Sequence, residues 1–256
     1  MKALLVSALL LITSLSAQAV SFSLLKGNGF RDDLGYRSDK TTLTIENFTM
    51  WELGTVFFYY DITEPTTDDA GPNYSNQFFG GISPTFSLSK MTGKNWSYGF
   101  IRDVSVRVEY ESGSGNGAYN FRNYFYGLQY DLVVPGFDFF SFNTVLRDSP
   151  LSKGVGWQLG AFWQMSWDNG PWKKFRFTGF LATSPVDGDV DPGLPGFSKR
   201  GRFLTSQPQL LYDVGQGLWN KPNRFEVGFE YAYFLNRFQQ DGKDEKVLQY
   251  MTKVSF

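Results

Sequence analysis

The chain has no cysteine and no histidine among its 256 residues. The first absence excludes disulfide bonds and thiolate metal sites. The second removes the imidazole bases that many hydrolases use and the usual ligands of zinc and iron. Its 24 basic and 25 acidic residues give a formal net charge of -1. This balance provides no basic field for nucleic acid, so no nucleic-acid polymer is expected as a partner.

Long hydrophobic runs are also missing, since no window beyond residue 19 approaches the roughly 20 apolar residues of a membrane-spanning helix. The protein is therefore either soluble in the periplasm or crosses a membrane with β-strands. Aromatic residues favour the second interpretation, because Phe, Tyr and Trp make up 18% of the chain. Transmembrane barrels use such residues for their lipid-facing band and its girdles. The mean hydropathy of -0.27 agrees, because each strand also carries a polar inner face.

The N-terminal residues predict export. Met1 and Lys2 open a short positive region, an apolar stretch covers 4–15, and residues 17–19 form an A-x-A cleavage motif. We expect a signal peptide over 1–19 and a mature domain over 20–256. A buried N-terminal helix is the alternative, but such a helix does not normally end in a cleavage motif.

The C-terminal residues predict a membrane strand that runs to the end of the chain. Apolar and aromatic side chains alternate with polar ones over 247–256, with the period of two that a half-buried strand requires. A terminal aromatic residue such as Phe256 resembles the ending of Gram-negative outer-membrane barrels, where it serves as an assembly signal. The cell outer membrane is the expected location.

Counting alternating or aromatic-rich segments between turn signals predicts twelve strands. They cover 20–26, 40–49, 52–62, 77–89, 100–111, 119–132, 137–147, 155–167, 173–183, 202–213, 224–235 and 246–256. Short and long connections alternate, which is typical of an all-β, up-and-down antiparallel transmembrane β-barrel. An even number of strands places both chain ends on the periplasmic side. No internal repeat or composition break divides the domain.

The stretch 100–111 alternates most regularly. Val104, Val106 and Val108 share one face, while Asp103, Arg107 and Glu109 share the other. Carboxylates and an arginine in one row suit a watery lumen, because their cost on a lipid face is prohibitive. A soluble sandwich with one solvated face is the alternative. The same division recurs in 155–165 and 224–235, which favours the barrel.

The stretch 83–100, SPTFSLSKMTGKNWSYGF, resembles a segment of the nucleoside-specific channel family of outer-membrane proteins (Tsx-like, OmpK-type). The matching residues are Pro84, Ser87, Leu88, Thr92, Gly93, Lys94, Ser97 and Gly99. The sequence departs from the family pattern at Met91, Trp96, Tyr98 and Phe100. Weaker matches include Glu46, Tyr60 and Asp61. The motif is a structural turn signature. The resemblance implies a twelve-stranded barrel, and a narrow pore in which aromatic side chains contact the base and ionisable groups the sugar.

Strand parity gives the pore-lining and substrate-binding candidates. These are Asp103, Arg107, Glu109, Phe125, Asp131, Phe139, Arg147, Phe162, Lys174, Arg176, Phe180, Glu226 and Glu230. A base stacked on an aromatic ring gains ~1–3 kcal/mol, which suits the weak and reversible binding that conduction needs. Two alternatives stay open. The phenylalanines can be filler, and the charged residues can form a network that stiffens or plugs a narrow barrel.

The sequence signals for catalysis and for metal binding are weaker. The pairs Glu109 with Glu111 and Glu226 with Glu230 suggest glycosidase carboxylates. Neighbours at spacing two on one strand, such as Glu109 and Glu111, lie ~7 Å apart and can fit that geometry by accident. Alternating aspartates at 187–191 suggest calcium, although a solvated acidic loop explains them as well. We expect no enzyme activity, cofactor or metal.

The expected function is an outer-membrane channel for nucleosides or similar small polar solutes. The alternative is a narrow or plugged barrel that acts as a surface-binding protein, with phage attaching at the loops 63–76 and 184–201. The expected partners are the lipid bilayer with its lipopolysaccharide, the barrel assembly machinery and the solutes.

Overall fold

A computed structural model describes residues 20–31, 37–65, 77–114, 120–149, 155–167, 174–184, 202–237, 242 and 244–256. The predicted signal peptide at 1–19 and most of the two long loops lie outside these residues. Among the residues that the structure describes, no helix is long and apolar enough to span a bilayer.

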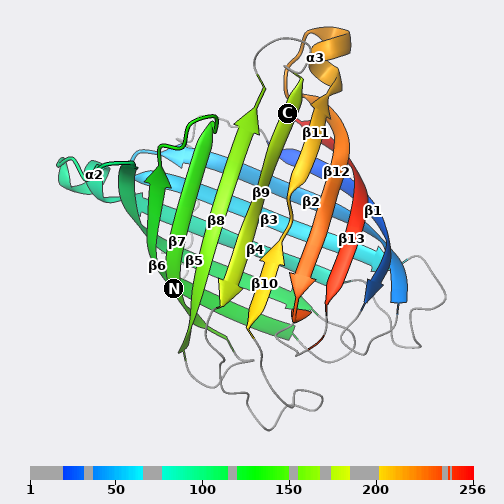
Figure 1. The fold of residues 1–256 in the computed structure, drawn as a ribbon, viewed down its shortest axis with the longest axis horizontal. Helices are drawn as coiled ribbons and strands as arrows, with labels where there is room; N and C mark the ends of the chain where they lie inside the picture. Colours follow the sequence, from blue (N-terminus) through cyan, green and yellow to red (C-terminus); the bar gives the residue numbers. More distant parts are fainter. Residues whose placement is uncertain are drawn as a thin grey trace, which may run out of the picture.

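The described chain is almost entirely antiparallel sheet, drawn in Figure 1. The strands are β1 (Ser21–Arg31), β2 (Arg37–Trp51), β3 (Gly54–Pro65), β4 (Gln77–Ser87), β5 (Ile101–Ser114), β6 (Asn120–Leu132), β7 (Phe139–Asp148), β8 (Val155–Ser166), β9 (Phe175–Ser184), β10 (Phe203–Ser206), β11 (Gln209–Asp213), β12 (Phe225–Leu235) and β13 (Glu245–Ser255). Two short helices, α2 (Leu88–Thr92) and α3 (Val214–Trp219), join β4 to β5 and β11 to β12.

The segments β10 and β11 form one strand of the barrel. Ser206 faces Leu181 of β9 and Gln209 faces Thr178, so the register continues unchanged across the gap. Pro208 interrupts the ladder because it has no N–H to donate. The Pro208 carbonyl still accepts from the Tyr231 amide at 2.9 Å. The barrel therefore has twelve strands, as predicted, and the expected strand 202–213 is confirmed as a unit.

The first and last strands close the barrel. Antiparallel pairing of β1 with β13 runs from Ser21 opposite Ser255 to Gly27 opposite Gln249. The amide of Phe256 donates to the carbonyl of Val20 at 3.2 Å, so the strand ends meet at one rim. Both helices lie at this same rim, with α3 beside the C-terminus in Figure 1. Closure removes the unpaired edges that a lipid environment does not tolerate.

Two of the predicted strand ends differ from the structure in an informative way. The first strand extends to Arg31 beyond its predicted end at 26, across a register shift between Gly27 and Phe30. The expected strand 77–89 ends at Ser87, because Ser87 caps α2 by accepting from the Lys90 amide at 3.1 Å. Gly93 closes this helix with a φ of 65°, a conformation that glycine adopts without strain. The TGK turn of the family motif is therefore a helix C-terminus.

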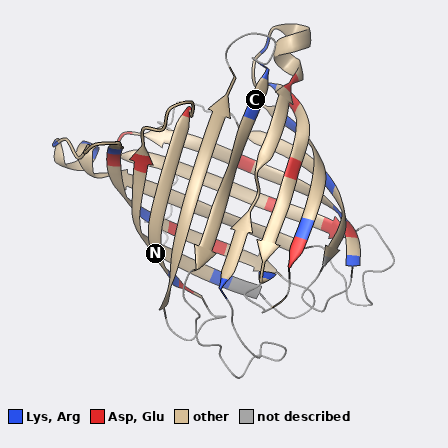
Figure 2. Cartoon of the chain, in the orientation of Figure 1, with Lys and Arg blue, Asp and Glu red and all other residues tan. Residues whose placement is uncertain are grey.

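Side chains alternate strictly between the two faces of the barrel wall. Along β13, Leu248 and Tyr250 are 55% and 67% exposed, while Gln249 and Lys253 are 4% and 7% exposed. A soluble sandwich has the opposite arrangement, with apolar residues buried and polar residues outside. Charged residues occur as isolated positions along mostly uncharged strands (Figure 2). The outer face is therefore the lipid face, and the polar residues line the enclosed space, the lumen.

Candidate functional site: the barrel lumen

Arg107, in the middle of β5, organises one side of the lumen. Its guanidinium pairs with Glu109 at 2.7 Å and donates to the Gln129 side chain at 2.8 Å and to the Ser83 hydroxyl at 2.7 Å. These partners lie on β4, β5 and β6, whose registers bring their inward residues side by side. Arg107 is only 5% exposed. Because its donors are used within the wall, the planar group is held in one orientation.

Two predicted aromatic residues form a platform beside this arginine. Phe162 of β8 and Phe180 of β9 are register partners, and their rings stack at a centroid distance of 6.3 Å and an angle of 29°. The Arg107 guanidinium lies 4.9 Å from the Phe162 ring centre. Both phenylalanines are half-buried, so part of each ring surface faces open space in the lumen. This arrangement can hold a planar solute by stacking.

The other two predicted stacking residues have different surroundings. Phe125 points inward from β6 but is only 1% exposed, because the Arg147 guanidinium lies over its ring at 5.8 Å. Phe139 is the first residue of β7 and is 44% exposed at the helix-bearing rim. Phe203 of β10, which the prediction omitted, contacts Arg147 from another side at 5.3 Å. Phe125 is therefore filler in the wall, and Phe139 is separate from the platform.

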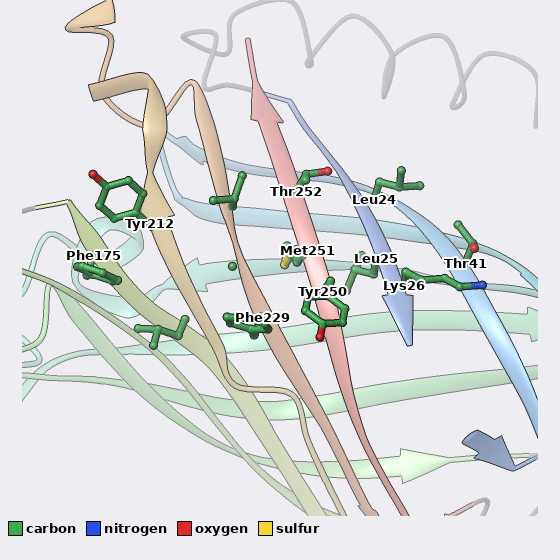
Figure 3. A pocket seen from close by; sticks show the side chains of 13 residues that line it. Leu24, Leu25, Lys26, Thr41, Phe175, Tyr212, Phe229, Tyr250, Met251 and Thr252 are labelled. Atoms are coloured by element: carbon green, nitrogen blue, oxygen red, sulfur yellow. The ribbon is translucent and has the colours of Figure 1, made fainter. Parts of the chain in front are cut away.

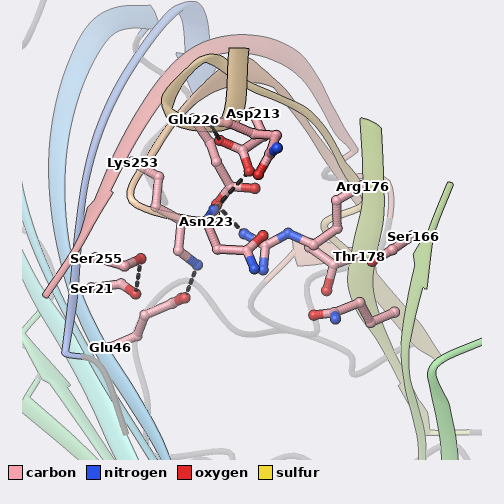
Figure 4. Close-up of polar contacts among 12 residues, drawn as sticks. Ser21, Glu46, Ser166, Arg176, Thr178, Asp213, Asn223, Glu226, Lys253 and Ser255 are labelled. Carbon is pink, nitrogen blue, oxygen red and sulfur yellow. Dashed lines mark hydrogen bonds and ion pairs between the residues drawn. The ribbon is translucent and has the colours of Figure 1, made fainter. Parts of the chain in front are cut away.

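Ion pairs occupy the lumen near the rim that carries the helices. Arg176 of β9 pairs with Glu226 of β12, and Lys253 of β13 pairs with Glu46 of β2. Figure 4 shows these four side chains pointing toward one another from four different strands. Glu226 and Lys253 also face each other in the ladder. Glu226 is 1% exposed, so this pairing is internal to the barrel.

Glu230 has neutral partners in place of a cation. Its carboxylate accepts from the side-chain amides of Gln207 at 2.9 Å, Gln209 at 2.7 Å and Gln249 at 2.7 Å. The two strands that pair with β12 bring these glutamines together, namely β13 and the strand interrupted at Pro208. Sequence parity placed each of these side chains inward, but it gave no register and so missed their convergence. Glu230 and Glu226 are fully engaged in separate networks, which does not support a glycosidase pair.

The remaining predicted site residues lie toward the rim or outside the lumen. Asp103 faces Asp131 across the ladder, and accepts from the hydroxyls of Ser87 at 2.5 Å and Ser89 at 2.7 Å. The prediction for Lys174 is corrected, because this residue lies just before β9 and its side chain does not line the lumen. Its ammonium lies 6.0 Å from the ring of Tyr212, an outward-facing residue of β11. The Lys174 carbonyl still accepts from the Asp213 amide at 2.7 Å, so the side chain departs from the expected position although the backbone continues the ladder.

Residues of β2 and β3 also contribute to the lumen, although the predicted site did not include them. The Tyr59 hydroxyl donates to Glu111 at 3.0 Å, and the Asn123 amide donates to the second oxygen of Glu111 at 3.1 Å. Asp61 accepts from the Thr44 hydroxyl at 2.5 Å. Asp61 and Glu46 belonged to the weaker family matches, which was the available signal for them.

No group of three or more potential metal ligands occurs among the described residues. The aspartates at 187–191, considered for calcium, lie outside them. The described part of the chain therefore adds nothing to a metal hypothesis.

One hollow of about 710 Å³ is formed mainly by outward residues of β1, β9, β11, β12 and β13 (Figure 3). Its lining includes Leu210, Phe229 and Tyr250, which belong to the apolar outer face. Gly228 lets β12 approach β11 closely at this point, because an added Cβ would meet the Leu210 carbonyl. This groove faces lipid and is not part of the lumen.

No protein-family model and no curated protein matches this sequence. Solved structures do match over nearly the whole chain. The NanC porin aligns with a TM-score of 0.50 and 11% identity, covering 92% of this chain and 98% of that one. The KdgM porin aligns with a TM-score of 0.47 and 11% identity, covering 93% and 99%. A KdgM porin in complex with disordered oligogalacturonate aligns with a TM-score of 0.45. The alignment with the NanC porin agrees with the fold seen in the strand pairing, a closed barrel of twelve antiparallel strands.

Proposed function

We propose that this protein is an outer-membrane channel through which nucleosides and similar small polar solutes diffuse. The observation that carries the proposal is the half-exposed pair Phe162 and Phe180, with Arg107 held against it inside a polar lumen. The platform offers a stacking face for a base, and the half-buried Gln158 and Gln164 on the same strand provide donors and acceptors. Such contacts are weak enough to allow release.

The barrel should be found in the outer membrane. We expect membrane fractionation to place it there, and we expect the unheated protein to migrate faster than the boiled protein on a detergent gel, because a closed barrel stays folded without heat. Recovery as a soluble periplasmic monomer would refute the membrane assignment.

Nucleoside preference should depend on the platform. In liposomes containing the purified protein, uridine should enter faster than a sugar of similar size, and its flux should saturate. The double variant Phe162→Leu with Phe180→Leu keeps apolar volume but removes both rings. Losing about 1–3 kcal/mol of stacking should raise the half-saturating uridine concentration roughly 5- to 150-fold.

Phe177→Leu is the matched control, because Phe177 lies on the outward face of β9 beside Trp163. It should leave uridine flux unchanged. Equal flux of uridine and sugar through the unmodified protein would remove the nucleoside assignment while leaving a general channel.

The second candidate is a plugged barrel that serves as a surface-binding protein. It is favoured by a fully buried apolar cluster on the inner face, formed by Leu25, Leu211 and Met251. An apolar cluster is unusual for a wall that should face water. A lack of flux for every small solute tested, from a correctly folded protein, would support this alternative.

A further inference from the structure

Among the residues that the structure describes, the inner wall of the barrel carries more negative than positive charge. Four inward carboxylates are neutralised by ion pairs, namely Glu109 with Arg107, Glu226 with Arg176, Glu46 with Lys253 and Glu245 with Arg237. These pairs contribute no net charge to the lumen. Its electrostatic character therefore depends on the inward charged residues outside the pairs.

The carboxylates that remain all accept hydrogen bonds from neutral groups. They are Asp61, Asp103, Glu111, Asp131, Asp213 and Glu230. Their donors are hydroxyls, side-chain amides and, for Asp213, the backbone amides of Gln216 at 2.8 Å and Asn223 at 2.7 Å. Neutral donors stabilise the ionised form of a carboxylate without cancelling its charge.

Within the described strands, two further cations face inward. Lys40 donates to Gln77 at 3.2 Å and is 3% exposed. Arg147 lies between the rings of Phe125 and Phe203, and its Nε atom has no hydrogen-bond partner. In formal charges, six carboxylates against two cations leave an excess of four negative charges. The six carboxylates are spread from Asp103 at one rim, through Glu230 in the middle, to Glu111 toward the other end.

We infer that the lumen selects by charge, admitting small cations and neutral solutes and rejecting anionic ones. The inference deepens the proposed function, since it requires an open channel. Fixed charges of one sign in a narrow passage with low-dielectric walls concentrate counter-ions and exclude co-ions. The selectivity arises from the whole wall, so no single carboxylate needs to bind an ion.

Ion selectivity can be measured on the full-length protein in a planar bilayer with a tenfold gradient of potassium chloride. The reversal potential should have the sign of a potassium-preferring channel. The double variant Glu230→Gln with Asp131→Asn halves the excess and should move the reversal potential toward zero. Arg147→Gln raises the excess and should move it the other way. Two opposite shifts separate an effect of charge from a general disturbance of the wall.

Glu64→Gln is the control, because Glu64 is exposed on the outward parity of β3. It should leave the reversal potential unchanged. In liposomes, glucosamine should enter faster than glucose, and glucose faster than glucuronate, since the three share a ring and differ in charge. A conducting protein that prefers chloride or glucuronate would overturn this inference alone. A folded protein that conducts nothing would overturn both the inference and the proposed function. If the double variant does not fold, Asp103→Asn, at the rim, provides the same test.

Discussion

Replacing Val106 by arginine is expected to destabilise the folded barrel by about 2–4 kcal/mol. Val106 lies in the middle of β5, points outward and is 37% exposed. An arginine there would place its charge among lipid chains, where no partner compensates for lost hydration. Urea unfolding of the protein in lipid vesicles measures the loss, and the shift between unheated and boiled samples on a gel measures the folded fraction.

Two variants control for this substitution. Val106→Leu keeps the site apolar and should fold as the unmodified protein does. Gln158→Arg introduces the same charge on the inner face of β8, at a half-buried position, and should cost less because the lumen is polar. If Gln158→Arg were the damaging variant and Val106→Arg harmless, the assignment of the lipid-facing and lumen-facing sides would be reversed. Arg107→Val is a poorer control, because it would leave Glu109 without its cation.

Replacing Glu226 by leucine is expected to cost about 3–5 kcal/mol of folding stability. The substitution leaves the Arg176 guanidinium inside the barrel without its carboxylate. It also removes the acidic residue that faces Lys253 across the ladder. Removing one member of an internal ion pair costs more than the pair contributes, since the remaining charge stays desolvated. The same urea titration in vesicles measures the effect.

The double variant Glu226→Leu with Arg176→Met tests the cause. Removing both charges should restore most of the lost stability, because no uncompensated charge remains. Glu52→Leu, an exposed residue in the turn between β2 and β3, should have little effect. If the double variant were as unstable as Glu226→Leu alone, packing around Glu226 and not its charge would be responsible.

The architecture of the wall followed from the sequence. A period of two in β5, β12 and β13 determined which residues face lipid and which face the lumen, because each outward row must be apolar and each polar row must be enclosed. Twelve such segments between turn signals determined the strand number. Pro208 did not disturb the count, since the flanking residues keep the parity of a single strand. Local patterns carry this information because facing is a property of one strand at a time.

The contents of the lumen were decided by tertiary structure. Glu46 pairs with Lys253 across 207 positions of sequence, and Glu230 meets glutamines from both of its neighbouring strands. These contacts depend on the stagger between strands and on closure of β1 against β13, which no local pattern encodes. The same stagger covers Phe125 with Arg147 while leaving Phe162 and Phe180 open. Sequence alone therefore determined which residues could line the lumen, and packing across the closed barrel determined which of them a solute can reach.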